Sequence, residues 1–219
     1  MDETVQAWVE GWVVSRGAAP PVAEPWGWTI DVGLIGHATR HVLGTTGDAL
    51  DETTVRKVAG GVTGHGVWLK AFRDPAVVSG WLGPGWWIDP ETGWLMTLPL
   101  TEDDVPEVPD GYRLRTWSRD GVTRLMVAAP DGSLAARGQI TPTGGTAVAD
   151  RIETAAAHRR KGLGSLVVRT LQQVAYRQGA RTGVLAGTPA GRALYEAVGW
   201  QVVAPLTSAR YGPPPAAQP

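Results

Sequence analysis

The stretch of sequence that decides the fold is Arg159-Arg160-Lys161-Gly162-Leu163-Gly164. A β-compatible segment, 149–154, comes just before it, and a segment of helical periodicity, 163–178, begins within it. A strand–turn–helix arrangement aims free backbone N–H groups and the positive end of the helix dipole at an anion. The glycines let a phosphate approach the backbone, and the basic side chains add charge. The stretch therefore predicts a binding site for a cofactor that carries a pyrophosphate.

The composition is that of a globular protein and excludes several kinds of site. The 219 residues suffice for one large or two small domains, and the absence of cysteine excludes disulfides, thiolate nucleophiles and zinc–thiolate centres. The four histidines complete no ligand pattern, so we expect no metal. The acidic start, 1–4, lacks the pattern of a signal peptide, and no apolar run is long enough to span a bilayer. We therefore expect a cytoplasmic protein with no membrane partner.

Charge is distributed unevenly along the chain. Residues 1–105 contain 6 Lys and Arg against 14 Asp and Glu, whereas residues 106–219 contain 14 against 7. A basic second half suits an anionic ligand, and an acidic first half favours a cationic acceptor. The basic residues are spread out without interleaved aromatics, which argues against a nucleic-acid partner. The alternative is a difference in surface charge without functional meaning.

Periodicity and turn signals predict alternating helices and strands before residue 100, then an antiparallel meander, then helix–strand–helix. The expected helices are 5–17, 51–62, 74–82, 163–178 and 189–198. The expected strands are 26–32, 39–43, 66–72, 86–88, 94–98, 112–117, 122–129, 133–141, 146–154, 182–186, 200–204 and 206–211. We expect 86–88 to pair with 94–98 across the turn between them.

The acidic segment 101–110, which proline punctuates, is the expected domain boundary. It divides the chain into a first domain, 1–105, a second domain, 106–212, and a disordered tail, 213–219. Nine of the eleven tryptophans precede residue 110, and most are expected to fill a core or an interdomain contact. Stacking of Trp86, Trp87 or Trp94 on a ligand is left open.

Two motifs in the second half resemble those of the GNAT acetyltransferase superfamily. Arg159, Gly162 and Gly164 match the family's R/Q-x-x-G-x-G/A turn, which His158 precedes as is common there. A later family element reads roughly N-x-x-A-x-x-L-Y-x-x-x-G-F, and its positions are occupied here by Thr188, Gly191, Leu194, Tyr195, Gly199 and Trp200. The Leu-Tyr pair and the Gly-aromatic pair match, whereas the asparagine and the alanine do not. A P-loop is absent, and Val167 replaces the third glycine of a dinucleotide fingerprint.

The resemblance covers roughly residues 110–211 and implies a fold and an activity. The fold is a mixed α+β acyl-CoA N-acyltransferase fold, with a mostly antiparallel twisted sheet between helices. The implied reaction transfers an acetyl group from acetyl-CoA, as co-substrate, to the amine of a small molecule or a peptide. A non-catalytic acyl-CoA-binding or regulatory module is the alternative, and a scaffold for protein interactions is a third. A homodimer is left open.

The resemblance also assigns residues to these tasks. The residues implied to bind the cofactor are Thr154, Ala155, Ala156, Arg159, Arg160, Lys161, Gly162, Leu163, Gly164, Ser165 and Thr188. Tyr195 is implied to give a proton to the departing thiolate, and packing of its ring on the cofactor is the alternative. Asp150 and Glu153 are the candidate bases, against the alternative of solvated surface charges. Because they are three apart on a strand, we expect them on opposite faces.

The second half departs from the family in one respect. Only Ser118-Arg119-Asp120-Gly121 separates its first two strands, where the family inserts helices that wall the acceptor site. We therefore expect residues 1–105, a diverged GNAT-like or accessory domain, to supply that wall. A pseudo-tandem protein with one working cofactor site follows from this interpretation.

Overall fold

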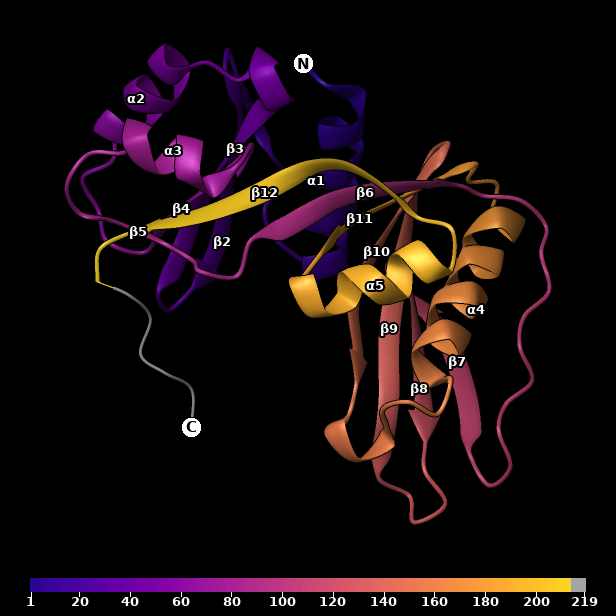
Figure 1. Cartoon of the computed structure of the whole chain (residues 1–219). Coiled ribbons are helices and arrows are strands. Elements are labelled where there is room, and N and C mark those ends of the chain that lie inside the picture. Colours follow the sequence, from indigo (N-terminus) through magenta and orange to yellow (C-terminus); the bar gives the residue numbers. More distant parts are fainter. Residues whose placement is uncertain (214–219) are drawn as a thin grey trace.

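One twisted sheet runs through the whole molecule, with helices on both of its faces (Figure 1). The computed structural model describes residues 1–213. Across this part of the chain the strand order is β1-β2-β3-β4-β12-β6-β11-β10-β9-β8-β7, and β5 pairs with β12 beside this path. The expected fold class is therefore confirmed. The expected tail lies outside the described residues apart from Pro213.

The elements follow the sequence prediction closely. The first half contains α1 (Glu3–Arg16), β1 (Val22–Glu24), β2 (Gly27–Leu34), β3 (His37–Thr46), α2 (Glu52–Gly60), β4 (Val67–Phe72), α3 (Pro75–Trp81), β5 (Trp86–Ile88) and β6 (Gly93–Pro99). The second half contains β7 (Arg113–Arg119), β8 (Val122–Ala128), β9 (Leu134–Thr143), β10 (Thr146–Thr154), α4 (Leu163–Arg177), β11 (Thr182–Gly187), α5 (Pro189–Ala197) and β12 (Gln201–Tyr211). Strands β7 to β10 form the expected antiparallel meander. Strand β1 was not expected.

The two halves repeat one order of elements, although the sequence carries no visible repeat. Antiparallel β2 and β3 lead through α2 to β4, which is parallel to β3. Antiparallel β9 and β10 lead in the same way through α4 to β11, which is parallel to β10. Each half then gives its last strand to the other: β6 pairs with β11, β12 pairs with β4, and β6 and β12 pair with each other. The two expected domains therefore share their central strands, and the boundary at residue 105 stays a prediction.

Two expectations about individual strands are wrong. In the described chain β5 does not pair with β6; both lie along β12, β5 beside Ala209–Tyr211 and β6 beside Gln201–Leu206. Strand β12 is continuous, whereas Pro205 had suggested a break. An irregularity in register between Val202 and Ala204 accommodates the proline. Pairing between distant segments thus overrode the local turn signals.

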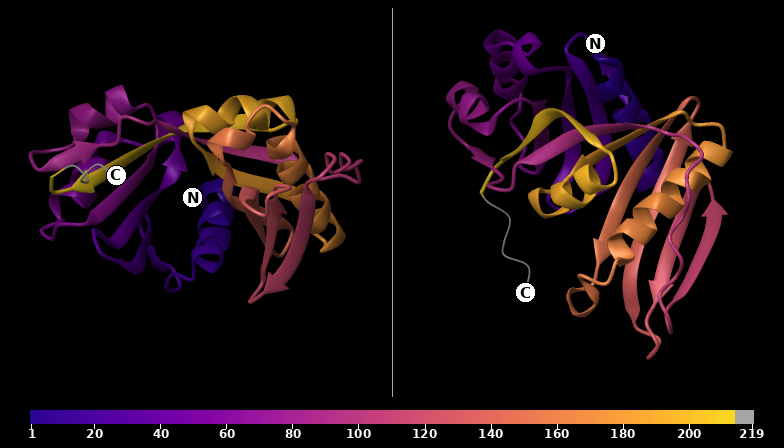
Figure 2. Two further views of the ribbon diagram at one scale, coloured as in Figure 1. Left: turned by 90° about the horizontal axis from the view of Figure 1, so that it is seen from below. Right: turned by 45° about the vertical axis from the view of Figure 1, so that its right-hand side comes forward.

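Helix α1 covers the face of the sheet opposite α4 and α5 (Figure 2). Asp2 caps its start by accepting a hydrogen bond from the backbone N–H of Thr4 at 2.8 Å, and Gly17, with φ of 61°, ends it. Its apolar side chains share one core with strands from both halves; the members include Val5, Trp8, Val9, Trp12, Val13, Val42, Phe72, Val148 and Val184. The first half therefore covers one face of the sheet of the second half.

Close approach of α1 to β10 depends on Gly11. A methyl group there would lie 2.4 Å from Cγ2 of Val148, well inside van der Waals contact. Glycine at this position therefore allows α1 to lie this close to β10.

We expect Gly11→Ala to lower the free energy of unfolding by about 1–3 kcal/mol, because the new methyl forces α1 away from β10. Urea unfolding measures this. Gly80→Ala in α3 is the matched control, since a Cβ there meets nothing within 4 Å and should be neutral or stabilising. In the double variant with Val148→Ala the two losses should be less than additive. Unchanged stability of Gly11→Ala would contradict the close packing.

Candidate functional site

Strands β10 and β11 are neighbours that separate after a short stretch of pairing. Thr146–Val148 pairs in parallel with Thr182–Val184, and beyond these residues β10 continues beside β9 while β11 continues beside β6. The facing edges of both strands therefore lose their sheet partner from Ala149 and Leu185 onward. Unpaired backbone groups on two diverging edges can hydrogen-bond an extended ligand that lies between them.

A β-bulge distorts β10 beside this opening. The register shifts between Asp150 and Glu153, and Arg151 between them has φ of 52°. The extra residue places Asp150 and Glu153 on the same face, so the expectation of opposite faces is wrong: strict alternation does not hold across a bulge. Glu153 lies opposite Arg137 and pairs with it at 2.9 Å, on the face where Gln139 contacts α1. Ile152 packs on the other face.

The turn between β10 and α4 leaves the start of the helix uncapped. Gly162 is the N-cap in left-handed conformation, with φ of 76°, and no side chain caps the helix. The backbone N–H groups of Leu163, Gly164 and Ser165 donate to no acceptor among the described residues. Arg160 also has positive φ, 63°, so the turn is tightly bent on either side of Lys161. These free donors at the positive end of α4 can hold an anion.

The basic side chains of the turn have different surroundings. Arg159 donates from Nε to the carbonyl of Thr154 at 3.3 Å, which ties the turn to the end of β10. Lys161 donates to the hydroxyl of Tyr112 at 3.2 Å, and the same hydroxyl lies 3.1 Å from Nδ1 of His158. Tyr112 thus supports the turn, and sequence analysis missed it because it lies far away along the chain. Arg160 is exposed to solvent.

The two glycines of the motif serve different purposes. A Cβ on Gly162 would meet nothing within 4 Å, so the space in front of it is open. A Cβ on Gly164 would lie 2.9 Å from Cδ2 of Leu194, so Gly164 lets α4 pack against α5. Only Gly162 therefore matches the sequence interpretation of a glycine that leaves room for a phosphate.

The other expected cofactor residues line the same turn with one exception. Thr154 ends β10, Ala155 donates its N–H to the carbonyl of Ala135, and Ala156 begins a short 3₁₀ turn. Leu163 turns its side chain into the core and Ser165 follows Gly164 in the first turn of α4. Thr188 is on the other side of the opening, where it caps α5 by accepting from the N–H of Gly191. Its hydroxyl is thus already engaged in a structural bond.

Tyr195 lies on α5 beside the end of β11. Its ring would be 2.9 Å from a Cβ on either Gly187 or Gly191, and it meets Trp200 edge-on at 6.2 Å between ring centroids. Burial, together with the negative charge of Asp150, raises the pKa of Tyr195 to about 12. The hydroxyl therefore keeps its proton at neutral pH and can act as a donor.

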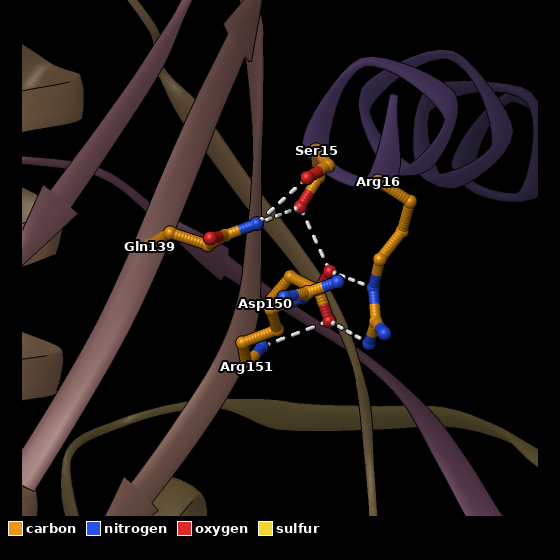
Figure 3. Close-up of polar contacts among 5 residues, drawn as sticks. All are labelled: Ser15, Arg16, Gln139, Asp150 and Arg151. Carbon is orange, nitrogen blue, oxygen red and sulfur yellow. Dashed lines mark hydrogen bonds and ion pairs between the residues drawn. The ribbon is translucent and has the colours of Figure 1, made fainter. Parts of the chain in front are cut away.

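Asp150 is engaged with the end of α1 (Figure 3). Its carboxylate accepts from the hydroxyl of Ser15 at 2.8 Å, from Nη2 of Arg16 at 2.8 Å and from its neighbour's backbone N–H, that of Arg151, at 2.8 Å. Gln139 completes the cluster by donating to the backbone carbonyl and the hydroxyl of Ser15. Burial would raise the pKa of Asp150, but the hydrogen bonds and charge of Arg16 and the bond from Ser15 outweigh it and lower the pKa.

This geometry makes Asp150 a weak proton acceptor that ties α1 to the bulge. Sequence analysis missed Ser15 and Arg16, because the residues they contact lie more than 120 positions away along the chain. An arginine at the end of an amphipathic helix carries no signal of such a contact.

The corresponding turn of the first half, between β3 and α2, cannot bind an anion in this way. Asp51 caps α2 by accepting from the N–H of Thr54 at 2.8 Å, so a carboxylate already occupies the start of the helix. Arg73 fills the turn by donating to the carbonyl of Gly47 and pairing with Asp48 at 2.8 Å. Of the two topologically equivalent turns, only the one before α4 leaves the helix start open.

Comparisons with known proteins identify the family of the chain. The model described as the Acetyltransferase (GNAT) family matches residues 88–200. The chain therefore belongs to the GNAT family, a family of acyltransferases. No curated protein sequence matches the chain.

Similar solved structures extend over both halves. A GCN5-related N-acetyltransferase from Kribbella flavida is 18% identical, covers 98% of this chain and 95% of its own, and gives a TM-score of 0.66. A GCN5-related N-acetyltransferase-like protein from Streptococcus suis is 13% identical over 96% of this chain and 93% of its own, with a TM-score of 0.60. A tandem GNAT protein from the clavulanic acid biosynthesis pathway is 16% identical over 98% and 97%, with a TM-score of 0.55. The fold is thus shared by complete chains.

Two further findings concern metals and membranes. Within residues 1–213 no three His, Cys, Asp or Glu side chains gather in a way that could hold a metal ion. Among the same residues no helix has the length and apolar character needed to cross a membrane.

The contacts of Asp150 predict a pH-dependent contribution to stability. A lowered pKa in the folded state means that the contribution is complete above the pKa of the unfolded chain, near 4, and is lost as the pH falls through the folded value. We expect Asp150→Asn to lower the free energy of unfolding by about 1–3 kcal/mol at pH 7. In urea unfolding experiments the difference should shrink at lower pH, once the parent carboxyl is protonated.

The matched control is Glu153→Gln, since Glu153 pairs with Arg137 at the surface. An exposed ion pair is worth little, so this change should stay within about 0.5 kcal/mol of the parent. Equal stabilities of the Asp150 variant and the parent at pH 7 would show that the ion pair with Arg16 does not tie α1 to β10.

Proposed function

We propose that this protein is an acetyl-CoA-dependent N-acyltransferase that transfers the acyl group directly to an amine. The observation that carries the proposal is the uncapped, basic start of α4 beside the opening between β10 and β11. The free N–H groups and the open space before Gly162 fit a pyrophosphate, and the diverging strand edges fit an extended pantetheine arm. The site residues named below are part of the proposal.

Each part of the turn has a role in this proposal. The N–H groups of Leu163, Gly164 and Ser165 bind phosphate oxygens, and Arg160, whose side chain is exposed, adds charge. Arg159 and Lys161 hold the shape of the turn through Thr154 and Tyr112, and remain within reach of the phosphates. Thr188 orders the start of α5 and is an indirect contributor.

The chemistry needs a path for one proton. The amine nitrogen attacks the thioester carbon, a C–N bond forms and the C–S bond breaks. Backbone N–H groups at the bulge of β10 stabilise the thioester oxygen as it gains charge. Tyr195 gives its proton to the departing sulfur and regains one from solvent.

The proton of the amine leaves through water or through Glu153. Asp150 is the poorer base of the two carboxylates, because its contacts with Arg16 and Ser15 stabilise the charged form. Glu153 is exposed, lies on the same face and is paired only with Arg137 among the described residues. We therefore assign Asp150 to positioning α1 and keep Glu153 as the candidate base.

Calorimetry with acetyl-CoA and thiol release with a panel of amines test the proposal. Binding together with thiol release on at least one amine supports it. Tight binding without turnover on any amine would favour the non-catalytic acyl-CoA-binding module instead. Absence of binding would overturn both.

Gly162→Val should weaken acetyl-CoA binding at least tenfold, because the side chain fills the space where phosphate oxygens are proposed to lie. The strain of positive φ costs about 1–2 kcal/mol of stability, so the protein stays folded. Gly144→Val is the matched control: Gly144 has φ of 61°, equally open surroundings, and lies in the turn at the other end of β10. It should lose similar stability and keep its affinity for acetyl-CoA. Equal affinities of the two variants would refute the site.

Tyr195→Phe should lower kcat by roughly tenfold to a thousandfold and leave the affinity for acetyl-CoA almost unchanged. The change keeps the ring that packs on Gly187 and Gly191 and removes only the proton. Steady-state kinetics and calorimetry on the same preparation measure both quantities. A variant that turns over like the parent would make Tyr195 a packing residue.

A further inference from the structure

An unusual concentration of positive charge lies on the α1 face of the sheet. Arg40 on β3 is directly opposite Trp68 on β4, Trp68 is opposite Arg210 on β12, and Arg210 is opposite Trp87 on β5. Directly opposed residues share a face of a sheet, so these four side chains form one row across four strands. The rings of Trp68 and Trp87 meet edge-on at 6.4 Å. Cations and tryptophans thus alternate along the row.

The next row adds a lysine to the same face. Lys70 is opposite Ser208 and donates to its hydroxyl at 2.6 Å, while its ammonium lies 5.0 Å from the centre of the Trp68 ring. Burial and the nearby charge of Arg40 lower the pKa of Lys70 well below its usual value, and Asp89 offsets this in part. We call the face that carries Arg40, Lys70 and Arg210 the cationic face.

Arg40 is the buried member of this group. Only 8% of its surface is exposed, and it is the one charged residue among the buried residues of the described chain. Its guanidinium stacks 3.9 Å from the centre of the Trp12 ring, and its Nε donates to Nε2 of His37 at 3.3 Å. Neither partner is a carboxylate, so no contact of Arg40 within residues 1–213 neutralises its charge. Burial and Arg16 lower the pKa of Arg40 to about 9.

The cationic face lacks the negative charge that would balance it. Two carboxylates have an electrostatic influence on Arg40 and Lys70: Asp150, which Arg16 already neutralises, and Asp89. Unpaired charge inside a protein is costly, and like charges in proximity add to the cost. Strained electrostatics of this kind are typical of sites at which a ligand supplies the missing charge.

The cationic face is continuous with the proposed reacting end of the opening. Trp12 lies between two arginines: Arg40 stacks on its ring at 3.9 Å and Arg16 at 5.9 Å. Arg16 in turn pairs with Asp150 at the bulge of β10. One arginine and one tryptophan of α1 thus connect the bulge to Arg40.

We propose that the cationic face binds an anionic group, a carboxylate or a phosphate, of the amine that this enzyme acylates. The inference rests on the proposed transferase function and names the acceptor class for it.

This proposal reverses the expectation of a cationic acceptor, which came from the acidic charge of residues 1–105 as a whole. Asp89 is the one acid of the first half that influences Arg40 or Lys70 among the described residues, whereas both of these cations converge on this face. The opposing interpretation is that stacking on tryptophan alone accounts for these cations.

Matched pairs of amines test the acceptor class. β-Alanine is compared with β-alanine amide, and phosphoethanolamine with ethanolamine, by thiol release from acetyl-CoA. We expect kcat/KM to be at least tenfold higher for the anionic member of at least one pair. Equal rates within both pairs, or a preference for the neutral members, would overturn the proposal.

Arg40→Gln and Lys70→Gln identify the groups responsible. Each should reduce the preference for the anionic member at least tenfold, while Arg115→Gln on exposed β7, a matched loss of one positive charge, should leave it unchanged. Circular dichroism and acetyl-CoA affinity verify that each variant is folded. If Arg40→Gln does not fold, Lys70→Gln carries the test alone. A preference that survives the loss of the lysine or the arginine would contradict the assignment.

Direct binding separates this inference from the proposed function. If no amine is acylated, the transferase proposal fails, and the anion site is then tested by titrating inorganic phosphate and β-alanine against tryptophan fluorescence. Trp12, Trp68 and Trp87 all lie at the cationic face, so a bound anion should change the signal. Saturable binding in the parent and in Arg115→Gln, weakened at least tenfold in Lys70→Gln, supports the site. No saturable change in the parent overturns it.

Discussion

The pairing of β6 with β12 is the constraint on which the rest of the structure depends. Each of these strands follows from one half of the chain and completes the sheet of the other, so neither half has a finished sheet by itself. The core beneath α1 combines side chains from both halves for the same reason. At the opening, β11 leaves β10 after three paired residues but stays paired with β6 along its other edge, so β6 holds this wall in place. The exchange of strands therefore positions both walls of the candidate site.

The two halves share one topology, but the turn before α2 is filled by side chains of the protein, whereas the turn before α4 is open. In the first half Asp51 caps the helix and Arg73 fills the turn, and the resulting bonds stabilise the fold without needing a ligand. In the second half Gly162 leaves the same position open, which gives up the side-chain cap at a cost of a few tenths of a kcal/mol. The absence of a side-chain cap distinguishes α4 from α2, and α4 is the helix at which we propose that the ligand binds.

Features that depend on neighbouring residues were predicted from the sequence, whereas features that depend on contacts between distant residues were not. Helical periodicity placed α1, α4 and α5, and the glycine turn before α4 was recognised because its requirements are local. The pairing of β5 and the continuity of β12 were not predicted, because β12 is paired with strands more than 100 residues away. The bulge in β10 moved Glu153 to the face of Asp150, and strand alternation gives no sign of a bulge. The positive charges of Arg40 and Lys70 are visible in the sequence. Their position on one face of the sheet follows from the register of β3, β4 and β12, which the sequence does not show.

The large sequence separation between β6 and β12 also determines how the protein can fold. The central pair of the sheet joins residues 93–97 to residues 201–206, so its closure brings together segments that are more than 100 residues apart. Contacts of such large sequence separation fold slowly, because the entropy of a long loop is lost before any contact compensates for it. Until β12 arrives, β4 and β6 keep exposed edges that invite pairing with other chains. A chain in which β12 has not yet paired is therefore open to misassembly at β4 and β6, and β12 is the strand that protects both edges.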